Sequence, residues 1–73
     1  MDNILIIEDS KIINKIVANE LKKFDFNISQ AYTLAQARSF LQQNSYKLII
    51  LDLHLPDGEG SELIANIQSL TKT

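Results

Sequence analysis

The chain has 73 residues, a formal net charge of -2, 45% apolar and 22% charged residues, and no cysteine. The absence of cysteine excludes a disulfide framework and thiolate zinc sites, and the apolar runs are too short to span a bilayer. The first residues lack the basic segment of a signal peptide, and the nearly balanced charge gives no indication of nucleic-acid binding. We therefore expect a cytoplasmic domain with no membrane or nucleic-acid partner.

The first predicted element is a strand, Ile4 to Ile7, which ends in the acidic pair Glu8-Asp9. Short apolar runs bounded by polar residues are typical of strands that are covered on both faces of a parallel sheet. Ser10 can cap a following amphipathic helix over 11–23. The predicted apolar face of this helix comprises Ile12, Ile13, Ile16, Val17, Leu21 and Phe24, and the polar face comprises Lys11, Asn14, Lys15, Asn19 and Lys22.

The middle of the chain predicts a more polar strand over 27–32, which suits the edge of a sheet. Residues 33–36 have the pattern of a capping box and open a helix that should end near Asn44. A third, strongly apolar strand follows over 47–53, then a turn at 56–58 and a final helix from Ser61 to about Leu70. The order βαβαβα predicts an α/β fold with three layers, in which parallel strands are joined by right-handed crossovers.

Two of the predicted strands end in acids, because Asp52 closes the run Leu48 to Leu51 as Glu8 and Asp9 close the first run. The carboxyl ends of parallel strands share one edge of the sheet, where ligands bind, and neighbouring strands lie about 4.8 Å apart. We therefore expect the acids to share a pocket, in which a proton or a divalent cation offsets their repulsion. An oxygen-only cluster suits Mg²⁺. Either strand end alone could carry ordinary turn or cap residues, but acids at both ends favour a site.

Two motifs in this chain resemble those of response regulator receiver domains. They are Ile-Ile-Glu-Asp-Ser over 6–10 and Leu-Asp-Leu-His-Leu-Pro-Asp-Gly over 51–58. The resemblance implies a CheY-like, flavodoxin-like fold with strand order 2-1-3. It also implies that Asp52 is the phosphoacceptor and that Mg²⁺ is held by Glu8, Asp9, Asp52 and the backbone carbonyl of His54. A sensor histidine kinase or phosphotransfer protein would be the partner in a two-component phosphorelay. A lone histidine side chain is not expected to bind metal.

The chemistry is consistent with that resemblance. A carboxylate can attack phosphorus to give an acyl phosphate when a metal neutralises charge on the transferring group. Asp52 would supply the attacking oxygen, while Pro56, Asp57 and Gly58 would shape the turn. The chain is then a regulatory phosphoacceptor and not an enzyme, apart from its own phosphorylation and dephosphorylation.

The length implies a partial domain, because the family has five strand-helix units and this chain predicts three. We expect residues 1–73 to form a single partial receiver domain without the fourth and fifth units, and so without the family's hydroxyl residue and lysine. Switching should then be impaired and stability marginal. The third strand would be a free apolar edge, which predicts a homodimer through this strand or through exchanged elements. Alternatively, the chain is a proteolytic or designed fragment of a longer regulator.

Two other function classes are compatible with the sequence. A half receiver could serve as an interaction module that is never phosphorylated, in which case Mg²⁺ binding would not depend on Asp9. A phosphohydrolase of the haloacid dehalogenase type would also use an aspartate after a buried strand. That family requires a second aspartate two residues later, and this chain has His54 there.

Overall fold

The computed structural model describes residues 2–52, 54–61 and 63. The elements in chain order are β1 (Asp2–Ile7), α1 (Lys11–Leu21), β2 (Phe26–Ala31), α2 (Leu34–Gln43), β3 (Leu48–Leu51), β4 (His54–Leu55) and β5 (Gly58–Glu59). Of the predicted final helix, only Ser61 and Leu63 are described, and both are helical. The rest of that helix, like the predicted strand residue Leu53, lies outside the described residues.

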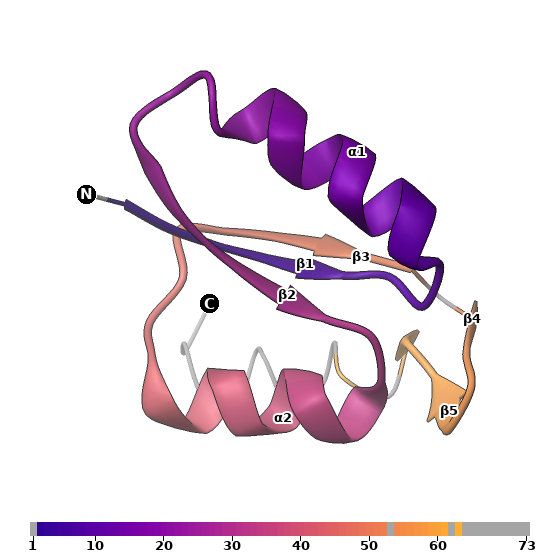
Figure 1. Ribbon diagram of the computed structural model, residues 1–73. Helices are drawn as coiled ribbons and strands as arrows, with labels where there is room; N and C mark the ends of the chain where they lie inside the picture. The colour runs from indigo at the N-terminus through magenta and orange to yellow at the C-terminus, as the bar shows by residue number, and fades with distance from the viewer. Residues whose placement is uncertain (1, 53, 62, 64–73) are drawn as a thin grey trace.

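The described strands β1, β2 and β3 form a parallel sheet in the order β2-β1-β3. In the central strand, Ile4 is paired with Ile28 of β2 on one side and with Leu48 of β3 on the other. Helix α1 covers one face of the sheet and α2 covers the other (Figure 1). The predicted α/β class, the layers and the 2-1-3 strand order are confirmed, and the polar second strand is an edge strand as expected.

The main apolar core lies between the sheet and α2. Central strand β1 is fully buried from Ile4 to Ile7 because it has a neighbour on each side and a helix over each face. Two residues of β1, Leu5 and Ile7, belong to this core. The whole cluster comprises Leu5, Ile7, Ala31, Leu34, Ala37, Leu55 and Leu63. The cluster therefore joins the two crossover units to the segment that follows β3.

The predicted faces of α1 are partly wrong. Ile12, Ile13 and Ile16, expected in the core, are 73%, 50% and 57% exposed, whereas Asn14, expected in solvent, is fully buried. The helix turns this way because the Asn14 side chain hydrogen-bonds to backbone carbonyls at the end of the sheet. Small Ala18, one turn further on, is buried along the same face. Phe24, just past the helix, is also exposed.

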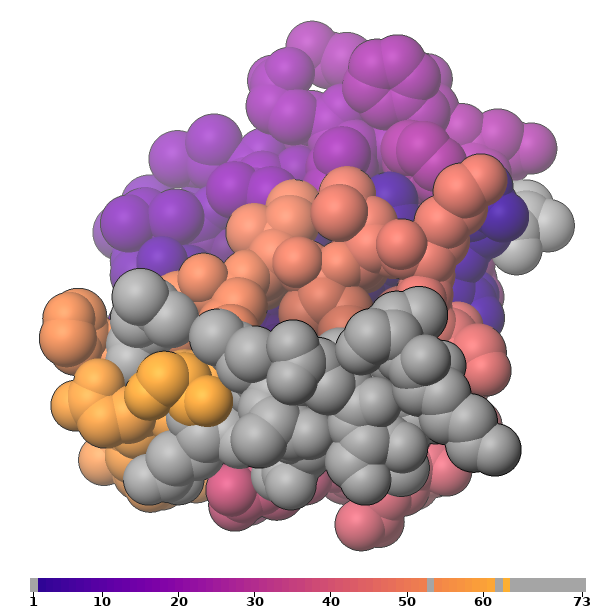
Figure 2. Space-filling view, turned by 180° about the vertical axis from the view of Figure 1, so that it is seen from behind, coloured from indigo at the N-terminus to yellow at the C-terminus, as the bar shows by residue number. Residues whose placement is uncertain are grey.

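The outer edge of β3 has no strand partner within the described part of the chain, and Leu48 on this strand is 48% exposed. Seen from behind, the salmon-coloured segment that contains β3 reaches the surface below the purple α1 (Figure 2). Residues 54–59 form a small antiparallel hairpin, β4 with β5, where the sequence predicted a simple turn. No helix among the described residues is long and apolar enough to cross a membrane.

Candidate functional site

The backbone places the acids at the carboxyl edge of the sheet. Glu8 directly follows β1, and its N–H donates to the carbonyl of Ala31 at 3.0 Å. Asp52 directly follows β3, and its N–H donates to the carbonyl of Ile7 at 2.8 Å. These two hydrogen bonds extend the parallel ladders by one residue beyond the strands. They therefore fix where the acidic side chains begin.

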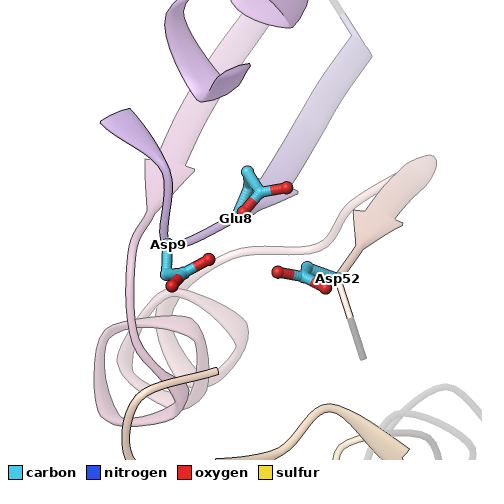
Figure 3. A group of neighbouring side chains, drawn as sticks. All are labelled: Glu8, Asp9 and Asp52. Atoms are coloured by element: carbon cyan, nitrogen blue, oxygen red, sulfur yellow. The ribbon is translucent and has the colours of Figure 1, made fainter. Parts of the chain in front are cut away.

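Glu8, Asp9 and Asp52 are brought together as the sequence predicted. Each offers a carboxylate oxygen, and these oxygens all lie within 4.8 Å of one another. The three side chains converge from the loop after β1 and from the end of β3 (Figure 3). Glu8 and Asp52 are half-buried and Asp9 is exposed. A cluster of carboxylates that opens to solvent is a donor set that suits Mg²⁺, which keeps several water ligands.

The carboxylates influence one another's protonation. The Ser10 N–H donates to Glu8 Oε2 at 3.0 Å, which lowers the pKa of Glu8. Burial and the nearby Asp9 and Asp52 carboxylates outweigh that bond, so the net pKa of Glu8 is raised. The pKa of Asp52 is lowered, chiefly by the His54 N–H that donates to its Oδ1 at 3.1 Å, and also by Glu8 and Asp9. In the metal-free site, Glu8 thus takes up a shared proton before Asp52 does.

The Asn14 side chain hydrogen-bonds to the backbone of the acidic loop, a role that the sequence did not reveal. Its Nδ2 donates to the carbonyl of Glu8 at 3.0 Å and to that of Ala31 at 3.2 Å, and its Oδ1 accepts from Gln30 Nε2 at 2.9 Å. Every hydrogen-bonding atom of this buried side chain is therefore used. A polar residue one turn into the helix, among exposed-looking lysines, gave no signal that would distinguish it from a surface asparagine.

His54 begins β4, and its side chain is exposed. Its Nδ1 lies 3.4 Å from Glu59 Oε2, a contact between two largely exposed groups that contributes little. The backbone N–H of His54 contacts Asp52, whereas the predicted metal contact of its carbonyl stays a prediction. Asp57, expected only to shape the turn, also accepts hydrogen bonds from Leu34 and Ala35 at the start of α2.

Comparison with known families matches residues 4–73 to the response regulator receiver domain. Among curated proteins, the swarming motility regulation protein RssB of Serratia marcescens is 38% identical over 64 residues, which are 86% of this chain and 29% of that protein. The KDP operon transcriptional regulatory protein KdpE of Escherichia coli is 35% identical over 68 residues, which are 93% of this chain and 30% of that protein. The chain thus spans less than a third of these relatives.

Solved structures of receivers superpose closely on the fold. The non-phosphorylated HemR receiver domain of Leptospira biflexa gives a TM-score of 0.91 at 29% identity, covering 99% of this chain and 58% of that one. The response regulator TrrA of Thermotoga maritima, solved in complex with Mg²⁺-BeF, gives a TM-score of 0.90 at 28% identity. The match covers 99% of this chain and 63% of the TrrA chain. The MaeR response regulator bound to beryllium trifluoride gives a TM-score of 0.86 at 36% identity. The match covers 100% of this chain and 62% of the MaeR chain.

The family match extends over both acidic strand ends and favours a receiver over the dehalogenase alternative. The sheet order and the converging acids agree with it. The chain therefore belongs to the response regulator receiver domain family, whose members are regulatory phosphoacceptors of two-component signalling and not enzymes.

Proposed function

We propose that this chain accepts a phosphoryl group on Asp52 in a Mg²⁺-dependent reaction. The observation that carries the proposal is the convergence of Glu8, Asp9 and Asp52, with carboxylate oxygens within 4.8 Å at the carboxyl edge of a parallel sheet. Receiver domains bind Mg²⁺, and the TrrA structure holds Mg²⁺-BeF. In this chain, the three carboxylates and the backbone carbonyl of His54 would be the Mg²⁺ ligands.

In the proposed reaction, an oxygen of Asp52 attacks the phosphorus of the donor. The new bond joins that oxygen to phosphorus, the bond from phosphorus to the donor atom breaks, and the donor leaves with the electron pair. The lowered pKa of Asp52, to which the His54 N–H contributes most, keeps the nucleophile ionised near neutral pH. Bound Mg²⁺ would supply charge neutralisation on the transferring group. Glu8 and Asp9 would hold that ion, and the backbone of Glu8 is fixed by Asn14 and by the hydrogen bond to Ala31.

The donor would be a phosphohistidine, because the receiver family implies a histidine kinase as partner. A phosphotransfer protein could present the same group, and a cytoplasmic location would give access to either.

The experiment is incubation with acetyl phosphate and Mg²⁺, followed by intact mass spectrometry. We expect a gain of one phosphoryl group that requires Mg²⁺, is absent in Asp52→Asn and is strongly reduced in Asp9→Asn. Asp25→Asn is the matched control, because Asp25 is an exposed acid in the turn before β2, away from the cluster. A folded protein without an adduct, or an adduct that persists in Asp52→Asn, would contradict the proposal.

A second candidate function is favoured by the outer edge of β3, which no strand of the described residues pairs with. In it, the chain is an interaction module whose third strand pairs with a second copy or another chain. The two functions differ in metal binding, because the module requires no Mg²⁺ affinity that depends on Asp9. Calorimetric titration of the unchanged chain and of Asp9→Asn with Mg²⁺ separates them.

A further inference from the structure

The first turn of α2 is capped by two different groups. The first amides of a helix have no partner within the helix, so side chains or water must accept from them. Here the Gln36 N–H donates to Thr33 Oγ1 at 3.1 Å, which is a local cap. The Leu34 and Ala35 N–H groups instead donate to Asp57 Oδ1 and Oδ2, at 2.7 and 3.1 Å, from a residue more than twenty positions away.

Asp57 lies at the turn of the hairpin that follows the phosphoacceptor. Leu55 is paired with Gly58, and His54 with Glu59, so each strand of this hairpin has two residues. A two-stranded hairpin is marginally stable on its own and needs packing against other elements. Leu55 supplies one anchor in the α2-side core, and the Asp57 carboxylate supplies the other at the start of α2.

The electrostatics of this contact are favourable. A helix N-terminus attracts negative charge because its free N–H groups and the helix dipole point at it. The pKa of Asp57 is lowered, first by the Leu34 N–H and also by the Ala35 N–H. The carboxylate is therefore in its accepting form throughout the neutral range, although the residue is at the surface.

We propose that Asp57 is a positioning residue for the phosphoacceptor site. By bridging to α2, it fixes the hairpin, and the hairpin fixes the backbone of His54 beside Asp52, where the His54 N–H already donates to Asp52 Oδ1. The part of this inference that concerns Mg²⁺ rests on the proposed function, because the His54 carbonyl is one of the proposed ligands. Asp57 itself contacts neither metal nor substrate.

The test compares Asp57→Ala with Thr33→Val. Both remove a cap from the same turn of α2, but only the first releases the hairpin, so Thr33→Val controls for the loss of helix stability. Amide hydrogen exchange in metal-free protein should show loss of protection at the Gly58 N–H or Glu59 N–H in Asp57→Ala only. Mg²⁺ affinity should fall about tenfold in Asp57→Ala, as for other residues that orient ligands, and stay unchanged in Thr33→Val. Asp57→Asn keeps one acceptor oxygen and should restore part of the affinity.

Each outcome decides between a positioning role and simple helix capping. Equal hairpin protection in Asp57→Ala and Thr33→Val, or equal Mg²⁺ affinity in the two folded variants, would overturn the positioning role. Failure of the unchanged chain to bind Mg²⁺ would instead contradict the proposed function. Exchange is measured without metal, so it still determines in that case whether Asp57 holds the hairpin.

Discussion

Asn14 connects the sheet to the acidic loop, because its Nδ2 donates to the carbonyls of both Ala31 and Glu8. In Asn14→Ala, the Glu8 carbonyl loses its side-chain donor, whereas the Ala31 carbonyl keeps the Glu8 N–H. The Glu8 hydrogen bond is part-buried. A desolvated acceptor without a partner costs about 1–3 kcal/mol, so for this part-buried carbonyl we expect the free energy of unfolding to fall by about 1 kcal/mol. Urea denaturation followed by circular dichroism measures this change.

The matched control is Asn19→Ala, because Asn19 is an exposed asparagine of the same helix. It should be neutral or slightly stabilising, since alanine has the higher helix propensity. Equal unfolding free energies for the two variants would show that the buried hydrogen bonds of Asn14 contribute nothing net.

Glu8 makes the stability of the fold depend on pH when no metal is present. Its pKa is raised above 4.5 in the folded state, although the Ser10 N–H opposes that shift, because burial and the neighbouring carboxylates exceed it. A carboxyl that binds its proton more tightly when folded stabilises the fold below its unfolded pKa, and that contribution is lost as pH rises through the folded pKa. Thermal unfolding in a chelator should therefore show stability falling above pH 4.5 relative to Glu8→Gln.

Added Mg²⁺ should recover the lost stability near neutral pH, because the ion offsets the repulsion that the proton offsets at lower pH. Asp52 titrates in the opposite sense, since its lowered pKa stabilises the fold above its ordinary 3.8 and that contribution is lost in acid. Parallel stability curves for the unchanged chain and Glu8→Gln above pH 4.5 would contradict the assignment of the shared proton to Glu8.

At the level of elements, the hairpin of β4 and β5 depends on one backbone conformation at Gly58. Gly58 has φ 151°, a region that side-chain-bearing residues occupy only with strain. Gly58→Ala should cost about 1–3 kcal/mol, measured as a lower free energy of unfolding, and should weaken Mg²⁺ binding with it. Glu59→Ala, in the same strand, is the control, because its exposed contact to His54 contributes little. A neutral Gly58→Ala would mean that the hairpin adapts without strain.

The elements also show where local sequence signals succeed. Ser10 and Thr33 cap α1 and α2 as predicted, because a cap contacts an N–H only three residues away. The Gln36 side chain reaches back, as a capping box requires, although it accepts from the N–H of Tyr32, the residue before the cap. The orientation of α1 was not predictable in this way, because it depends on carbonyls at the ends of two separate strands.

At the scale of the whole molecule, the free edge of β3 predicts self-association. Leu48 is 48% exposed on a strand that has no partner on its outer side within the described residues. Sedimentation at tens of micromolar should show a dimer, and Leu48→Lys should shift it toward monomer, because a charge on an edge strand opposes pairing. Ile12→Lys is the control, because Ile12 is exposed on the outer face of α1. It should leave the dimer unchanged if the edge of β3, and not the face of α1, is the interface. A folded monomer of the unchanged chain would contradict the predicted dimer.

Local sequence patterns were enough to predict the first three strands, the two helices between them, their caps and the acids at the ends of the first and third strands. These features follow from periodicity and from contacts between residues close in the chain, together with the rule that parallel strands end at one edge. Three features became known only from the folded arrangement: the buried face of α1, the hydrogen bond from Asn14 to the Glu8 carbonyl, and the capping of α2 by Asp57. Those outcomes depend on hydrogen bonds between segments far apart in the chain, whose partners no local spacing identifies.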